Sequence, residues 1–222
     1  MDLKKLIEIQ KEISSKVIIK EFKKEIKTIL SFDVSFKGDD GWGCGIVFDD
    51  KMNILKEEFV FKKASFPYIP TFLAFREIEF IKDLYEKLNI KPDIVLIDGQ
   101  GIAHPRKCGI ATHFGVLYQI PTIGVAKSYL YGRYEMPENK RFAYTYIYDE
   151  KNSIIGACLV TKENKKPIFI SPGNIIDTDS AVSIIKRFTT KYRIPEPLRI
   201  AHIKSNKYRK CNKNYIDFKS SS

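Results

Sequence analysis

The sequence contains no long apolar run. None of its 222 residues belongs to a stretch that approaches the ~18 consecutive apolar residues of a membrane-spanning helix. The first residues, MDLKKLIEIQKEISSKV, lack the uninterrupted apolar core and the small-residue cleavage site of a secretory signal. We therefore expect a cytoplasmic protein without a membrane span.

Cysteine is scarce and scattered. The four cysteines, at positions 44, 108, 158 and 211, form no CxxC pair, which argues against a zinc site and against a disulfide scaffold. We expect buried small residues or free thiols. Internal repeats and linkers rich in Pro, Gly and Ser are also missing. We therefore expect one monomeric domain over residues 1–222, with a basic, mobile tail over about 209–222.

The glycines do not complete a nucleotide-binding motif. Gly99 and Gly101 are followed by Ala103 and His104, so the GxGxxG spacing fails, and no GK[ST] sequence supports a P-loop. Two interpretations remain equally open. The glycines allow either a close approach of the backbone to a substrate or only a tight turn.

Positive charge is abundant. Lysine and arginine total 38 against 27 aspartates and glutamates, which gives a net charge of +11 and a pI near 9.3. This balance favours a polyanionic partner, either nucleic acid or an anionic membrane surface, although a general bias toward lysine explains it equally well. The 44% of hydrophobic residues is typical of a folded globular protein.

The apolar pattern predicts an α/β fold. Three strands joined by short turns precede a helix, a strand, a helix and a strand, which is the order of the ribonuclease H-like fold. We expect a central mixed sheet, with three antiparallel strands followed by parallel strands, flanked by helices, and with the first strand beside the fourth. The predicted strands are residues 28–36, 42–48, 54–61, 94–98, 122–126, 142–149, 153–161 and 167–171; the predicted helices are 3–17, 72–88, 110–118, 177–189 and 195–210.

Three carboxylates occupy unusual positions. Glu77 lies in the apolar stripe of its predicted helix, Asp33 lies within an apolar strand, and Asp98 ends the aliphatic strand IVLI. Each has an ordinary alternative: pairing of Glu77 with Arg76 or a lysine, a solvated strand face for Asp33, and a turn at Asp98. If the first and fourth strands are adjacent, the three acids converge, and a Mg²⁺ or Mn²⁺ ion relieves their repulsion. Such an ion in a basic protein suggests phosphodiester hydrolysis.

Five sequence blocks resemble a known family. They are FDVSF around Asp33, FPYIPTFLAFRE at 66–77, IDGQGIAHPRKCGIATHFG at 97–115, PTIGVAKSYLYG at 121–132 and RIPEPLRIAHI at 193–203. Together they cover most of the chain and resemble the endonuclease V family of deoxyinosine-directed repair nucleases. The resemblance implies a ribonuclease H-like fold and Mg²⁺- or Mn²⁺-dependent cleavage of the second phosphodiester bond 3′ to a deaminated adenine. The products carry a 3′-hydroxyl and a 5′-phosphate.

The resemblance also implies roles for individual residues. Asp33, Glu77 and Asp98 match the metal-binding acids, and His202 matches a histidine that contacts the metal site directly or through water. Lys127 matches the lysine near the scissile phosphate. Without the family, His202 reads as structural and Lys127 as a solvated strand end.

Two further regions match the family's contacts with damaged DNA. The loop of Pro67, Tyr68, Ile69 and Pro70 corresponds to a wedge that enters the minor groove and separates the lesion from its partner base. The alternative is an ordinary loop whose tyrosine packs inward. The flipped base is expected in a pocket formed by Leu73, Gly99, Gly101, His104 and Gly109.

Two positions depart from the family pattern. Thr71 replaces a glycine after the wedge, and Tyr129 replaces a commonly basic residue, so affinity and lesion range are the properties we expect to differ. The expected partner is DNA that contains deoxyinosine, with no membrane partner. Alternatives are an endoribonuclease for inosine-containing RNA, a broader structure-selective nuclease, and a non-catalytic nucleic-acid-binding protein.

Overall fold

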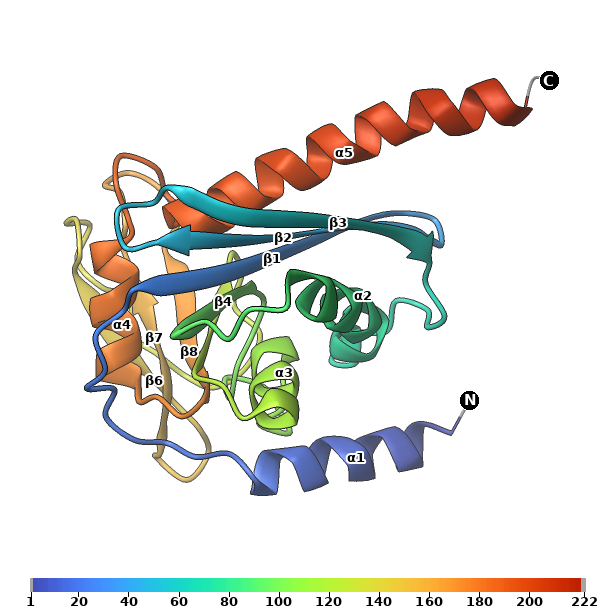
Figure 1. The fold of residues 1–222 in the computed structure, drawn as a ribbon. Coiled ribbons are helices and arrows are strands. Elements are labelled where there is room, and N and C mark those ends of the chain that lie inside the picture. Colours follow the sequence, from blue (N-terminus) through green and yellow to red (C-terminus); the bar gives the residue numbers. More distant parts are fainter. Residues whose placement is uncertain (1, 221–222) are drawn as a thin grey trace.

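A mixed eight-stranded sheet forms the centre of the molecule (Figure 1). The computed structural model describes the backbone of residues 2–220 and the side chains of residues 2–211. The strand order is β3-β2-β1-β4-β5-β8-β7-β6. The strands are β1 (Thr28–Lys37), β2 (Asp40–Asp49), β3 (Ile54–Lys63), β4 (Ile94–Asp98), β5 (Thr122–Ala126), β6 (Tyr144–Tyr148), β7 (Ile154–Leu159) and β8 (Ile168–Asn174).

The sheet confirms the predicted pairing of the first and fourth strands. Strands β1, β2 and β3 form an antiparallel meander, whereas β1 pairs with β4 in parallel, with Phe32 opposite Ile97. The next residues along these two strands are Asp33 and Asp98. Beyond β4, β5 continues the parallel pairing, and β8, β7 and β6 complete the sheet in antiparallel order. This is the mixed sheet expected for a ribonuclease H-like fold.

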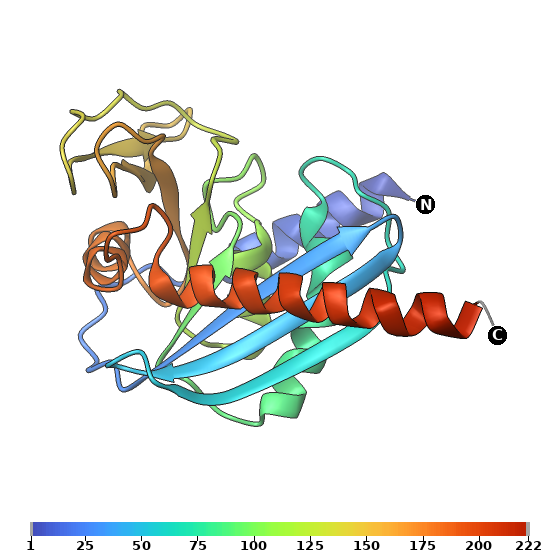
Figure 2. The same ribbon diagram turned by 90° about the horizontal axis from the view of Figure 1, so that it is seen from above.

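Helices cover both faces of this sheet. They are α1 (Leu3–Ser15), α2 (Leu73–Leu88), α3 (Ile110–Tyr118), α4 (Thr178–Arg187) and α5 (Glu196–Ser220). Helices α2 and α3 pack on one face, and α4 and α5 cover the other, with α5 lying across β1 and β2 (Figure 2). Helix α1 packs outside α3.

Alternation along β1 explains these two layers. Leu30 and Phe32 belong to the apolar core beneath α2 and α3, whereas Ile29 belongs to the core beneath α4. Ser31 lies on the side of α5, where its hydroxyl donates to the Pro197 carbonyl at 2.9 Å. Side chains two residues apart on a strand share a face. Asp33 therefore points toward α5.

The last helix is longer than the sequence pattern indicated. The prediction ended at residue 210, with a mobile tail over about 209–222, but α5 continues to Ser220. Residues 221–222 lie outside the described part of the chain. Helix α5 is anchored by Ala201, which packs against β2 residues, and by Tyr208, whose ring centroid lies 4.9 Å from that of Phe59 on β3. The sequence after Lys210 is mostly polar and carries no clear apolar periodicity, so it did not predict the further helical turns.

The cysteines agree with the sequence interpretation. Cys44, Cys108 and Cys158 are buried, Cys211 is exposed, and all four are free thiols. Burial raises the pKa of the Cys108 thiol to about 12, so this thiol stays protonated at neutral pH. Within residues 2–220, no helix combines the length and the apolar character needed to cross a membrane.

Candidate active site

A cavity of about 420 Å³ opens beside the carboxyl end of β4 and the middle of β1. It is bounded by α2, by the loop before α2, and by the segments that follow β4 and β5. Its lining includes ten of the fourteen residues to which the sequence assigned a role at the site: Asp33, Tyr68, Pro70, Leu73, Glu77, Asp98, Gly99, His104, Gly109 and Lys127. The other four, Pro67, Ile69, Gly101 and His202, do not line it.

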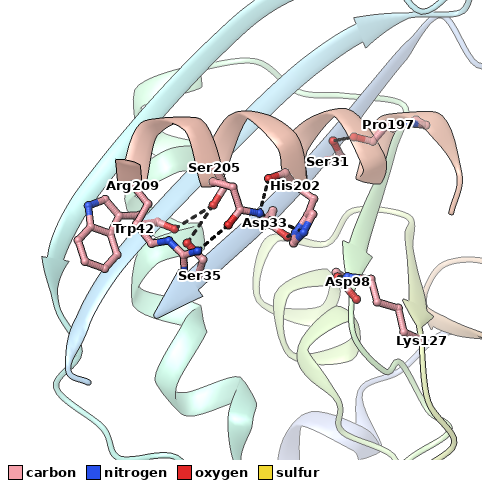
Figure 3. A network of polar contacts seen from close by, with 11 residues as sticks. Ser31, Asp33, Ser35, Trp42, Asp98, Lys127, Pro197, His202, Ser205 and Arg209 are labelled. Carbon is pink, nitrogen blue, oxygen red and sulfur yellow. Dashed lines mark hydrogen bonds and ion pairs between the residues drawn. The ribbon is translucent and has the colours of Figure 1, made fainter. Parts of the chain in front are cut away.

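Asp33 is buried and held by α5. The residue is 6% exposed, and Oδ1 lies 3.1 Å from Nδ1 of His202 (Figure 3). The Asn206 amide nitrogen lies 3.0 Å from Nε2 of this ring, while its oxygen accepts from Arg209 at 2.9 Å. Since Asn206 donates to Nε2, the histidine hydrogen resides on Nδ1 and is donated to Asp33. Helix α5 thus orients His202 onto the carboxylate.

Asp98 is paired with Lys127. The Lys127 ammonium group donates a hydrogen bond to Oδ2 of Asp98, across the parallel strands β4 and β5 (Figure 3). Burial raises the pKa of Asp98 above its usual value, and the charge of Lys127 opposes that shift. Arg193 donates to the Lys127 carbonyl at 2.8 Å and so fixes the backbone that carries this lysine. The lysine is therefore held beside the acids.

Glu77 approaches the cavity from the opposite face of the sheet. Its helix, α2, packs on the face away from α5. The pKa of Glu77 is raised well above its usual range, first by burial and then by the negative charges of Asp98 and Asp33. Among the described residues, no basic side chain forms an ion pair with it within 4 Å. A positive charge in the cavity would relieve this repulsion.

Arg76 does not serve as the partner that the sequence offered for Glu77. The Arg76 side chain is buried and stacks over the Phe36 ring. Its guanidinium donates to the carbonyls of Phe66, at 2.8 Å, and Gly38, at 2.6 Å. Neighbours in a helix point about 100° apart, so Arg76 and Glu77 face different surroundings.

The carboxylates of Asp33, Glu77 and Asp98 are chemically suited to bind a hard divalent cation. Oδ2 of Asp33 is buried and has no hydrogen-bond partner among the described residues, and the negative charges of Asp98 and Asp33 add to the effect of burial in raising the pKa of Glu77. Carboxylate oxygens are the ligands that Mg²⁺ and Mn²⁺ prefer. As the described side chains stand, no three His, Cys, Asp or Glu groups form a metal-binding cluster. In this arrangement the Lys127 ammonium group donates to Oδ2 of Asp98, and Nδ1 of His202 donates to Oδ1 of Asp33.

The loop before α2 presents its tyrosine to solvent. Tyr68 is 67% exposed, which overturns the alternative that this side chain packs inward. Pro67 and Pro70 are exposed as well, whereas Ile69 is half-buried. Prolines restrict the backbone on either side of the tyrosine. The loop is therefore a stiff projection at the rim of the cavity.

Glycine is required at positions 99 and 101 for two different reasons. Gly99 lines the cavity with φ of 150°, a conformation that L side chains rarely adopt. Gly101 lies behind the cavity wall, where an added Cβ would come within 2.0 Å of the Pro172 carbonyl oxygen. The close approach predicted for the glycines is thus, at Gly101, an approach to strand β8 of the protein itself.

Several residues of the site escaped the sequence analysis. Gln100 lines the cavity, is 8% exposed, and leaves Oε1 without a partner in the described part of the chain, while its amide donates to the Ser128 carbonyl at 3.2 Å. Its place between two glycines after Asp98 was the available signal. Asn206 follows His202 by four residues, the spacing of helical neighbours, which was the signal for that contact.

The chain matches known proteins along most of its length. A family model described as endonuclease V matches residues 11–203. The endonuclease V of Thermosipho melanesiensis is 46% identical over 198 residues, which covers 89% of this chain and 87% of that protein. The endonuclease V of Petrotoga mobilis is 42% identical over 204 residues, covering 91% of this chain and 92% of that protein.

Solved structures show the same architecture. The endonuclease V of Bacillus subtilis has a TM-score of 0.91 at 30% identity, covering 97% of this chain and 95% of that one. The endonuclease V of Ciona intestinalis, in complex with a 24-mer DNA that contains an inosine followed by a ribo-adenosine, has a TM-score of 0.83 at 30% identity and covers 94% and 98%. With the family model matched across α1 to α5 and relatives above 40% identity, this chain belongs to the endonuclease V family of nucleases.

Proposed function

We propose that this protein cleaves DNA at deoxyinosine, by hydrolysing the second phosphodiester bond 3′ to the lesion and leaving a 3′-hydroxyl and a 5′-phosphate. The observation that carries the proposal is one cavity whose lining combines three acids, Asp33, Glu77 and Asp98, with the exposed Tyr68 of the loop before α2. The complex of the Ciona intestinalis relative with inosine-containing DNA supports the choice of lesion. The net charge of +11 supports a nucleic-acid partner.

The acids and the lysine divide the chemistry between them. Asp33, Glu77 and Asp98 would hold Mg²⁺, or Mn²⁺ in its place, with His202 orienting Asp33. When bound, the ion activates water and stabilises negative charge on the phosphate and the leaving oxygen. Lys127 reaches the cavity from the end of β5, so its ammonium group can turn from Asp98 to a phosphate oxygen.

The same cavity suits an extruded base. Leu73, Gly99, His104 and Gly109 line it together with the acids, and bare glycine backbone lets amide groups approach the edge of a base. Extrusion of a base costs a few kcal/mol of free energy. The cost is lower for a base that pairs weakly, as hypoxanthine does. Lesion selection and hydrolysis thus share one opening.

A cleavage assay with a mapped product tests this function. We expect an end-labelled duplex with one deoxyinosine to be nicked once, one nucleotide beyond the bond that adjoins the lesion. Excess chelator should stop the reaction and added Mg²⁺ should restore it. The undamaged duplex is the control. Cutting that ignores the lesion would remove the pocket assignment, whereas cutting that persists in chelator would remove the metal assignment.

Replacement of Tyr68 by serine tests the wedge. Stacking of one base on an aromatic ring contributes about 1–3 kcal/mol, so kcat/KM for the inosine duplex should fall about tenfold. A single strand with the same inosine should be cut with nearly unchanged kcat/KM, because no partner base has to be displaced. Tyr192→Ser, which alters another exposed tyrosine outside the cavity, is the matched control. Equal losses on duplex and single strand would contradict the role of Tyr68 as a wedge.

Inosine in RNA is the second candidate substrate. The Ciona intestinalis relative was solved with an inosine followed by a ribo-adenosine, so a ribose next to the lesion is compatible with binding in that protein. Recognition of RNA depends on contacts with the 2′-hydroxyl. Cleavage rates of DNA and RNA strands of the same sequence, each with one inosine, would distinguish the two functions. Cutting of RNA alone would replace deoxyinosine with inosine as the proposed target.

A further inference from the structure

The carbonyl oxygen of Thr71, directly after the wedge loop, is held by three donors. Gln10 Nε2 lies 3.0 Å from it, His104 Nε2 lies 2.9 Å from it, and a terminal nitrogen of Arg106 donates at 2.9 Å. Thr71 has φ of 66°, a left-handed conformation that costs a β-branched residue free energy. The three donors therefore stabilise a backbone geometry that threonine alone disfavours.

Gln10 joins this carbonyl to the Cys108 segment of the cavity wall. It lies on α1, is 0% exposed, and also directs Nε2 to the Cys108 carbonyl at 3.3 Å. Its Oε1 accepts from Nε of Arg106 at 2.5 Å. Thr71 and Cys108 both line the cavity. A residue 61 positions before Thr71 thus bridges two parts of the wall through one amide group.

His104 contributes as a neutral donor. Burial lowers the pKa of its imidazole to about 4, so the ring carries one hydrogen at neutral pH. The Arg106 backbone amide lies 3.2 Å from Nδ1, which makes Nδ1 the acceptor and places the hydrogen on Nε2, facing Thr71. The same arginine stacks over the Phe72 ring, with 4.4 Å between the guanidinium carbon and the ring centroid.

The other end of the loop is anchored as well. Arg76, buried in α2, donates to the Phe66 carbonyl at 2.8 Å. Arginines therefore hold the loop on both sides, at Phe66 and at Thr71, while Tyr68 between them stays exposed. Restricting a loop before it binds reduces the entropy lost on binding.

We propose that Gln10 of α1 is a positioning residue for lesion recognition. Together with Arg106 and His104 it clamps Thr71, keeps the loop of residues 66–71 in its projecting conformation, and holds the Thr71 and Cys108 walls at a fixed separation. The role in lesion recognition rests on the proposed function. The clamp on Thr71 rests only on the hydrogen bonds described above.

Gln10→Met tests the clamp, because methionine keeps the length and helix propensity of glutamine but neither donates nor accepts these bonds. Loss of a buried hydrogen-bonding group should raise KM for the inosine duplex about tenfold and leave kcat within about twofold. Amide hydrogen exchange over residues 66–72 should become faster in the free protein. Glu8→Gln, an exposed change on the same helix, should alter neither quantity.

Arg106→Lys gives an independent variant if Gln10→Met unfolds. Lysine keeps the charge but cannot bridge Gln10 and Thr71 with a planar fork, so it should produce the same changes in KM and exchange. Unchanged KM and unchanged exchange in a folded variant would overturn the clamp. If the unaltered protein failed to cut inosine DNA, the proposed function would fall. Exchange would still decide the clamp, with faster exchange supporting it and unchanged exchange refuting it.

Discussion

Replacing Asp98 with alanine should slow cleavage of inosine-containing DNA by about 10³-fold or more, which corresponds to about 4 kcal/mol in the barrier. Asp98 lines the same cavity as Glu77 and Lys127 and ends the buried strand β4. Its removal takes away a ligand for the proposed ion and the partner of the lysine. Affinity for DNA should change little, because basic residues that contact phosphates supply most of the non-specific binding.

The fold should tolerate this change. Burial raises the pKa of Asp98, so the folded state disfavours its ionised form, and loss of the charge does not lower stability at neutral pH. We expect the thermal midpoint of Asp98→Asn to equal or exceed that of the unaltered protein. Asp83→Ala is the matched control, because Asp83 pairs with Lys62 at 2.7 Å outside the cavity. Full cleavage activity in the Asp98 variants would refute the assignment of this acid to the metal site.

Substitution of Gly101 by alanine should produce the largest loss of stability among the changes considered. An added Cβ would lie 2.0 Å from the Pro172 carbonyl oxygen and 2.8 Å from that of Ser171, and both belong to the backbone of β8. Such overpacking against backbone costs about 3 kcal/mol. The Gly101 amide also donates to the Ser171 hydroxyl at 2.7 Å, so displacement of the segment strains that bond as well. Urea-induced unfolding measures the difference directly.

Gly38→Ala separates crowding from backbone strain in this comparison. Gly38 has φ of 59° and no neighbour within 4 Å of the added Cβ, so alanine there should cost only about 1 kcal/mol. A Gly101 variant that keeps its unfolding free energy but loses discrimination between inosine and undamaged DNA would contradict the structural role of this glycine. It would instead support the role in the base pocket that the family resemblance implied.

The sequence by itself determined the sheet and the nature of the site. Apolar patterning and turn residues are local properties, so they specified the order of the elements. That order is the one of the ribonuclease H-like fold, and it predicted the pairing of β1 with β4 that the sheet shows. Carboxylates inside apolar segments were informative for the same reason, because burial of an unpaired charge is unfavourable wherever the chain leads afterwards. Asp33, Glu77 and Asp98 do line one cavity. Their binding of a metal stays a prediction.

The tertiary structure alone decided which partners the buried polar groups take. Arg76 binds the Phe66 carbonyl and not Glu77, Gly101 packs against β8, and Gln10 bridges Thr71 and Cys108. The hydrogen bonds among these contacts join residues 10 to 98 positions apart, and no local pattern specifies the position and direction of a carbonyl outside its own element. Hydrogen bonds depend on a few tenths of an ångström and on angle, whereas hydrophobic burial depends mainly on area. Apolar patterning therefore predicts the layers of a fold, and only the packed layers select the polar contacts at its site.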